Sequence, residues 1–225
     1  MDTYLNILLK DNMETLELET MEKISVKIVP GQYEGGQTGA SEFVEASCRE
    51  EAVKLFSESK ERMQDINNWE HICSGESAGF CLTDKKGNEI NTIPEIGNLI
   101  RIDLPGPGSK KGDGYDWVRI EEIEEQINDE SDEELFAFRV RPTNNPMLPS
   151  GPIAHMFKAY ATSSFILYRS ENIVRMSQEG RNEIPNTDVT GVTDKIRNAV
   201  VSLFATLGLS IPQWKKLVRG ILAIK

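Results

Sequence analysis

Between residues 78 and 178 the sequence holds six short strand-like runs that are separated by turns, and apolar and polar residues alternate clearly at 98–104 and 135–142. Alternation with a period of two is typical of strands that bury one face and expose the other. Short connections between successive strands favour antiparallel pairing. The sequence therefore predicts an antiparallel sheet of five to seven strands, and the six runs are residues 78–83, 98–104, 116–127, 135–142, 163–168 and 173–178.

The alternation also assigns the two faces of this sheet. In the run 116–127 the apolar positions shift by one residue between Ile120 and Ile123, which indicates a β-bulge. The side chains expected to be buried are Ile100, Ile102, Leu104, Val118, Ile120, Phe136, Phe138 and Val140. The opposite face should carry Arg101, Arg119, Arg139 and Arg141. These arginines could bind an anion, but we expect cross-strand ion pairs with acids such as Asp103 and Glu121.

Other patterns precede the six runs. Residues 24–30 alternate as a first strand, and residues 31–40 are predicted to form a glycine-rich loop. A helix is predicted to begin at Ser41, because the apolar residues that follow it recur at helical spacing. A second short helical element is predicted around Trp69, within residues 64–73.

The C-terminal part returns to helical spacing. Residues 195–207 form one apolar stripe that Gly208 ends, as a glycine after a helix commonly does. A second stripe, residues 211–222, follows a capping box that begins at Ser210. The helix at 195–207 is expected to cover one face of the sheet, which gives a two-layer α+β fold.

The predicted order, β-α-α-β6-α, resembles the helix-grip fold of the START, Bet v 1 and polyketide-cyclase-like superfamily. The local resemblance lies in the helix from Phe43 toward Trp69, which ends in INNWEHI, and in GNLIRIDL at residues 97–104. Asn98 stands where members of that family often have aspartate. The resemblance covers residues 24 to 207, and the loop 142–162 and the segment after Gly208 depart from it.

The resemblance implies an elongated apolar cavity between the sheet and the C-terminal helix, which would hold a lipid-like, aromatic or polyketide-like molecule. It also suggests the domain organisation. Residues 1–22 are expected to be an N-terminal helical arm, and residues 23–207 the helix-grip-like domain. Residues 208–225 are expected to be a basic helix packed on or beside that domain.

Charge restricts the partners. The chain has 25 basic and 36 acidic residues and a net charge of −11. Residues 195–225 hold six basic residues and no acid, so the first 194 residues carry −17. This excess argues against binding to nucleic acid or to an anionic membrane. The exception is the C-terminal segment, where binding to an anionic partner is electrostatically possible. Its sequence loosely resembles a helix–turn–helix, which would place Lys215, Lys216 and Arg219 on a second helix.

Location is also inferred from the sequence. Three cysteines without CxxC spacing indicate reduced thiols, and the N-terminus has neither a basic region nor an apolar core of a secretion signal. No apolar stretch reaches the roughly 20 residues that a transmembrane helix needs. We therefore expect a cytoplasmic protein.

Several segments that resemble functional motifs have simpler interpretations. The acidic run 121–134 lacks the glycine of a calcium loop and is expected to be a solvated hairpin tip. The glycine-rich residues 106–114 lack P-loop order, although they could form a lid over a cavity. His71 and Cys73 have no further ligands for zinc. The cluster at residues 180–186, which includes Glu183, could line a cavity mouth but fits turn chemistry better.

The sequence thus favours a cytosolic module that binds an apolar small molecule without catalysis, with no catalytic residue, cofactor or metal. The cavity mouth is expected near residues 106–114 and 142–160. The ligand contacts predicted there combine apolar area with a hydrogen-bonding tip or lie on the second helix: Trp117, His155, Phe157, Tyr160 and Trp69.

Two functions from other classes stay open. One is an enzyme of the same architecture, such as a cyclase, hydratase or hydrolase, which would place convergent polar groups and a perturbed pKa inside the cavity. The other is an interaction protein that docks through Trp214 and the basic C-terminal helix and leaves an apolar patch exposed.

Overall fold

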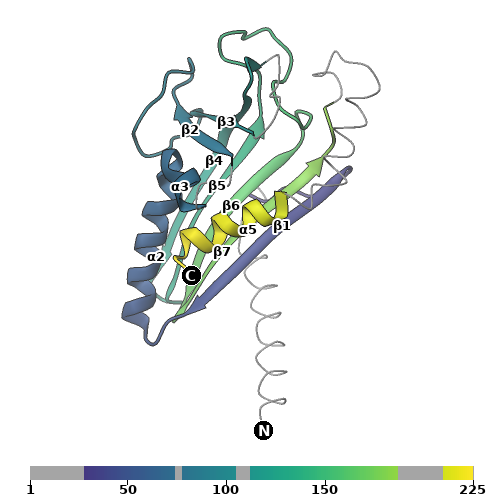
Figure 1. Cartoon of the computed structure of the whole chain (residues 1–225). Helices are drawn as coiled ribbons and strands as arrows, with labels where there is room; N and C mark the ends of the chain where they lie inside the picture. Colours follow the sequence, from purple (N-terminus) through teal and green to yellow (C-terminus); the bar gives the residue numbers. More distant parts are fainter. Residues whose placement is uncertain (1–27, 74–77, 105–111, 187–209, 225) are drawn as a thin grey trace.

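A computed structural model describes residues 28–73, 78–104, 112–186 and 210–224. The predicted N-terminal arm, the predicted helix at 195–207 and most of the glycine-rich segment 106–114 lie outside the described residues. Figure 1 shows one twisted sheet with helices on one side of it. No helix within the described ranges is long and apolar enough to cross a membrane.

Seven antiparallel strands form the sheet, in the order β1-β7-β6-β5-β4-β3-β2. Each strand from β2 to β7 pairs with the next along the chain, and β1 closes the other edge by pairing with β7. The bounds are β1 Gly36–Glu45, β2 Gly79–Thr83, β3 Leu99–Asp103, β4 Asp116–Asn128, β5 Glu133–Pro142, β6 Thr162–Ser170 and β7 Ile173–Glu183. The register of β4 on β5 shifts between Ile120 and Glu122, which confirms the predicted bulge.

Between β1 and β2 lie the helix α2 (Arg49–Gln64), a 3₁₀ turn (Ile66–Asn68) and the short helix α3 (Trp69–Ile72), and α5 (Ser210–Ile221) follows the sheet. The order β-α-α-β6-α is therefore confirmed, with β1 rather than residues 24–30 as its first strand and α5 as its described last helix, since residues 195–207 lie outside the described residues. The fold is α+β with a helix-grip arrangement of elements. We call the face that carries α2, α3 and α5 the helix face, and the opposite one the outer face (Figure 1).

The prediction for residues 36–48 was wrong. Residues 36–45 form an edge strand rather than a loop and the start of a helix, and α2 begins only after Cys48. The cause is pairing with β7: Phe43 lies opposite Arg175, and Val44 opposite Val174. The predicted strand at 24–30 is also not found in its described part, because residues 28–30 form a turn and bend, in which Ile28 is buried against the outer face.

The helix face carries the main hydrophobic core, built around Trp69. The Trp69 ring lies 5.3 Å from that of Phe80, 6.2 Å from Phe138 and 5.1 Å from Phe165. Six of the eight side chains predicted to point inward are buried, and Ile102 and Leu104 are half-buried against the same core.

Helix α5 is docked on this core rather than free. Its buried residues Leu217, Val218 and Ile221, and Leu222 directly after it, belong to the main core. The ring of Trp214 lies 5.6 Å from that of Phe165 and 6.3 Å from that of Phe80. A side chain at Gly220 would meet the Ile72 carbonyl oxygen at 2.7 Å, so glycine lets α5 approach α3 closely.

The charged side of α5 is also engaged with the sheet. Lys215 and Arg219 each lie within 4 Å of the Glu42 carboxylate on β1, at 3.7 and 3.5 Å. Trp214 packs against the core, so Trp214, Lys215 and Arg219, which were predicted to dock on a partner, already have contacts within the fold.

Candidate ligand-binding site

The five residues predicted as ligand contacts do not share one face of the sheet. Trp69 is buried in the core of the helix face, and its indole N–H donates to the Met63 carbonyl at 3.2 Å. Val118 belongs to the same core, so its strand neighbour Trp117 points to the outer face. There Trp117 packs with Leu99 and Ala154.

His155 and Phe157 lie near Trp117 in the segment that covers this part of the outer face. The backbone N–H of Trp117 donates to the Ala154 carbonyl at 2.8 Å, and the rings of His155 and Phe157 are 5.7 Å apart. Tyr160 follows in the same segment and has 52% of its surface exposed. The structure therefore brings Trp117, His155 and Phe157 into one region, and leaves Trp69 on the other face.

His155 forms a buried polar contact with Asp116. Its Nδ1 accepts a hydrogen bond from the Phe157 N–H at 2.9 Å, which leaves the proton of the neutral ring on Nε2, 4.0 Å from Asp116 Oδ2. The same carboxylate oxygen accepts the Met156 N–H at 2.8 Å. Burial lowers the pKa of His155 below its ordinary value and outweighs the opposing charge of Asp116.

This lowered pKa predicts a pH dependence of stability. As the pH falls from about 7 to about 5, the unfolded chain takes up the histidine proton before the folded protein does, so the free energy of unfolding should decrease. In His155→Asn the side-chain oxygen can still accept the Phe157 N–H but cannot titrate. Thermal unfolding of both proteins across this range should show a shallower loss in the variant, whereas equal slopes would contradict a buried neutral His155.

A different polar cluster lies on the helix face, at the end of β7 next to β1. Gln178 is fully buried, and neither its Nε2 nor its Oε1 has a hydrogen-bond partner among the described residues. Alternation along β7 places Gln178 on the same face as Val174 and Met176 of the main core. Buried amides are almost always paired, so an unpaired one calls for a partner from elsewhere. Among the described residues, the buried hydroxyl oxygen of Thr162, on the outer face, also lacks a hydrogen-bond partner.

Glu183 brings a carboxyl group to the same cluster. Its Oε1 accepts a hydrogen bond from the Thr38 hydroxyl at 2.9 Å. A side chain at Gly180 would meet this Oε1 at 2.2 Å and Thr38 Oγ1 at 2.4 Å, so the bare backbone of Gly180 makes room for both groups. Burial raises the pKa of Glu183, although the Thr38 hydrogen bond and the charge of Arg181 act to lower it.

This cluster was only partly visible in the sequence. Residues 180–183 continue β7 rather than forming a turn, and Thr38 falls in the segment that was wrongly predicted as a loop. The signal that could have found Gln178 is its position: it continues the inward phase of Val174 and Met176, where a polar side chain is unusual.

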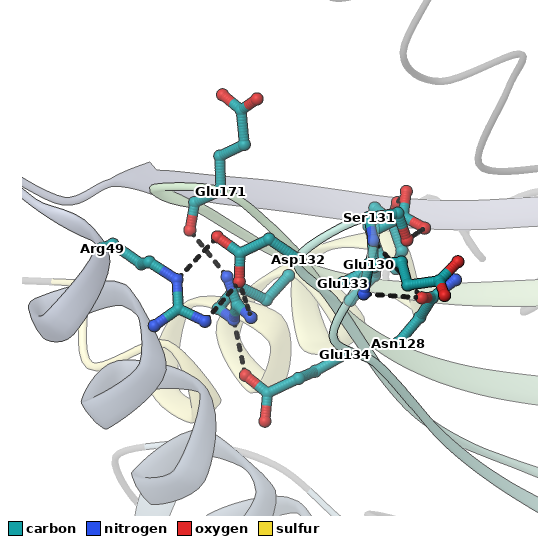
Figure 2. A network of polar contacts seen from close by, with 10 residues as sticks. Arg49, Asn128, Glu130, Ser131, Asp132, Glu133, Glu134 and Glu171 are labelled. Carbon is teal, nitrogen blue, oxygen red and sulfur yellow. Dashed lines mark hydrogen bonds and ion pairs between the residues drawn. The ribbon is translucent and has the colours of Figure 1, made fainter.

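Two charged clusters are explained by structure alone. Figure 2 shows the contacts around Asp132 at the β4–β5 hairpin, which tie it to Arg49 of α2. Arg169 also donates to Asp132, at 2.8 Å, and to Glu134 at 2.5 Å. Arg49 and Arg169 together hold the pKa of Asp132 at about 2. The charged groups of this network pair with one another, so we assign the network a structural role.

Three of the four outer-face arginines form the expected ion pairs, whereas the guanidinium of Arg101 lies over the Tyr115 ring, 4.8 Å from its centroid. Glu121 lies 2.6 Å from Arg141, 3.2 Å from Arg139 and 3.7 Å from Arg119. Burial acts to raise the pKa of Glu121, but Arg141 and Arg139 lower it below its ordinary value. Within the described ranges no three His, Cys, Asp or Glu side chains are grouped so that they could hold a metal ion.

Comparison with known proteins identifies no family by sequence. No family model and no curated protein matches the chain. Among solved structures it is similar to a hypothetical protein of Helicobacter pylori, at 12% identity and a TM-score of 0.49, over 89% of this chain and 93% of that chain.

Two plant proteins also match in structure. A major latex-like protein of Panax ginseng matches at 12% identity and a TM-score of 0.34, over 84% of this chain and 97% of that chain. A truncated norcoclaurine synthase from Thalictrum flavum matches at 10% identity and a TM-score of 0.35, over 87% and 99%. Likenesses this distant carry no argument about this chain, and the helix-grip assignment rests on its own element and strand order.

Proposed function

We propose that this protein binds an apolar small molecule, and that the ligand lies on the helix face beside Gln178. The single observation that supports this most is the fully buried Gln178 amide, which lacks a partner among the described residues. An unpaired buried amide costs stability, and a bound ligand that hydrogen-bonds to it would remove that cost. Ligand sites typically combine apolar walls with a few such polar groups.

The surroundings of Gln178 provide the apolar walls. Phe165 lies directly opposite Gln178 on β6, and Ala40 lies opposite it on β1. The ring of Phe165 is in turn 5.6 Å from that of Trp214 and 5.1 Å from that of Trp69. An aromatic or lipid-like molecule would therefore find ring contacts next to a hydrogen-bonding amide.

Titration with the neutral fluorophore N-phenyl-1-naphthylamine tests this proposal. We expect a Kd of about 10 µM or tighter. Ala40→Phe places a ring opposite Gln178 and should weaken binding about tenfold or more, because the added side chain occupies the proposed ligand position. Circular dichroism confirms that the variant is folded.

Phe157→Ala is the matched control, because it removes a ring from the outer face. It should leave the affinity within about twofold. Loss of binding in Phe157→Ala alone would instead place the ligand near Trp117 and His155, at the position predicted from the sequence. If no fluorophore binds and native mass spectrometry finds no co-purified small molecule, the proposed function is wrong.

One observation favours a second function, that of an enzyme. The raised pKa of the buried Glu183 carboxyl is the property of a group that can act as a general acid or base. A small molecule that co-purifies with the protein would distinguish the two functions. A carrier returns it with its mass unchanged after incubation, whereas an enzyme changes the mass, and Glu183→Gln abolishes the change.

A further inference from the structure

We infer that the ligand carries an uncharged group with an adjacent hydrogen-bond donor and acceptor, such as a carboxamide or a lactam, which pairs with the side-chain amide of Gln178. This inference rests on the proposed function and goes one step further, because it names the chemical class that the site would recognise.

The two atoms of the Gln178 amide determine this class. Oε1 accepts hydrogen bonds and Nε2 donates them, and both are buried without a partner among the described residues. A ligand ketone or ether would pair with Nε2 alone and leave Oε1 unpaired. A protonated ligand amine would pair with Oε1 alone and leave Nε2 unpaired. Only a group that presents a donor beside an acceptor satisfies both atoms, through two parallel N–H···O bonds.

The charges around Gln178 disfavour an anionic ligand. The Glu183 carboxyl lies over Gly180, two residues further along β7 on the same face, which is roughly 7 Å along a strand. The basic side chains Lys215 and Arg219 of α5 already face Glu42. A carboxylate ligand would therefore meet the Glu183 carboxyl group, and Arg181, the cation that acts on Glu183, is already paired with Glu179 at 2.9 Å.

The neighbouring rings indicate the rest of the ligand. Phe165 flanks Gln178 on β6 and belongs to the aromatic group that includes Trp69 and Trp214. A planar ring system attached to the amide group would place its faces or edges against these rings. Aromatic carboxamides are thus the simplest members of the inferred class.

Three naphthalenes that differ only in the polar group test the inference by isothermal titration calorimetry on the full chain. 2-Naphthamide offers a donor and an acceptor, 2-acetylnaphthalene only an acceptor, and 2-naphthoate a negative charge. The wild-type protein should bind 2-naphthamide about tenfold more tightly than either of the others. In Gln178→Met, which keeps the shape but loses the amide, this preference should fall to about twofold or less.

Ser177→Met is the matched control, because Ser177 is the strand neighbour of Gln178 and points to the outer face. It should keep the full preference for 2-naphthamide. The inference is overturned if the wild type shows no preference for 2-naphthamide, or if the preference survives in Gln178→Met. In either case, binding of the compounds would still support the proposed function. If none of the three compounds binds, the inference fails, and the fluorophore titration with native mass spectrometry decides separately whether the proposed function fails too.

Discussion

Replacing Phe138 with alanine is expected to lower the free energy of unfolding by about 4 kcal/mol. Phe138 is fully buried, and its ring lies 5.1 Å from that of Phe165 and 6.2 Å from that of Trp69. Truncation removes these contacts and leaves a cavity that the surrounding strands cannot close. Urea unfolding followed by tryptophan fluorescence and by circular dichroism measures the change.

Arg139→Ala is the control, because Arg139 is the next residue along β5 and points to the outer face. It should cost less than about 1 kcal/mol, since Glu121 keeps Arg141 and Arg119 as partners. A larger loss in Arg139→Ala than in Phe138→Ala would mean that the faces of the sheet are assigned the wrong way round.

Arg169→Met should produce the second-largest loss, about 2–3 kcal/mol. Arg169 is only 2% exposed and donates to three groups: Asp132, Glu134 and the carbonyl of Glu171. The variant leaves the two carboxylates without this cation. The loss is placed at the low end for a buried pair because both carboxylates are still in contact with water. The midpoint of urea unfolding reports it.

Arg49→Ala removes the exposed partner of the same Asp132 and is the matched comparison. Arg49 has 56% of its side chain exposed, so its loss should shift the unfolding midpoint far less than that of Arg169. Equal shifts would show that the network acts through Asp132 rather than through the buried guanidinium of Arg169.

Much of the fold could be predicted because alternation reports burial directly. The six runs became β2 to β7, and even the bulge after Ile120 was visible as a change of phase. Edge strand β1 was not, because Gly36 and Gly39 carry no side chains to alternate and its position depends on β7, far along the chain. Local pattern cannot report a pairing at that distance.

The sequence analysis placed the candidate site elsewhere than beside Gln178. Trp117 was chosen for its chemistry, although the inward assignment of Val118 already implied that Trp117 faces outward. Gln178 was passed over because a strand that ends in a polar residue looks like a strand reaching solvent. Only the burial of its amide distinguishes it from an exposed glutamine.

The most direct test of the site is the stability of ligand-free Gln178→Met. If the Gln178 amide has no partner in the free protein, replacing it with an apolar side chain of similar shape removes an unpaired buried group. Urea unfolding of the ligand-free protein should then show a gain of about 1–2 kcal/mol over the wild type. A loss of stability would contradict the account, because it would mean that the amide is already paired in the free protein and is not held ready for a ligand.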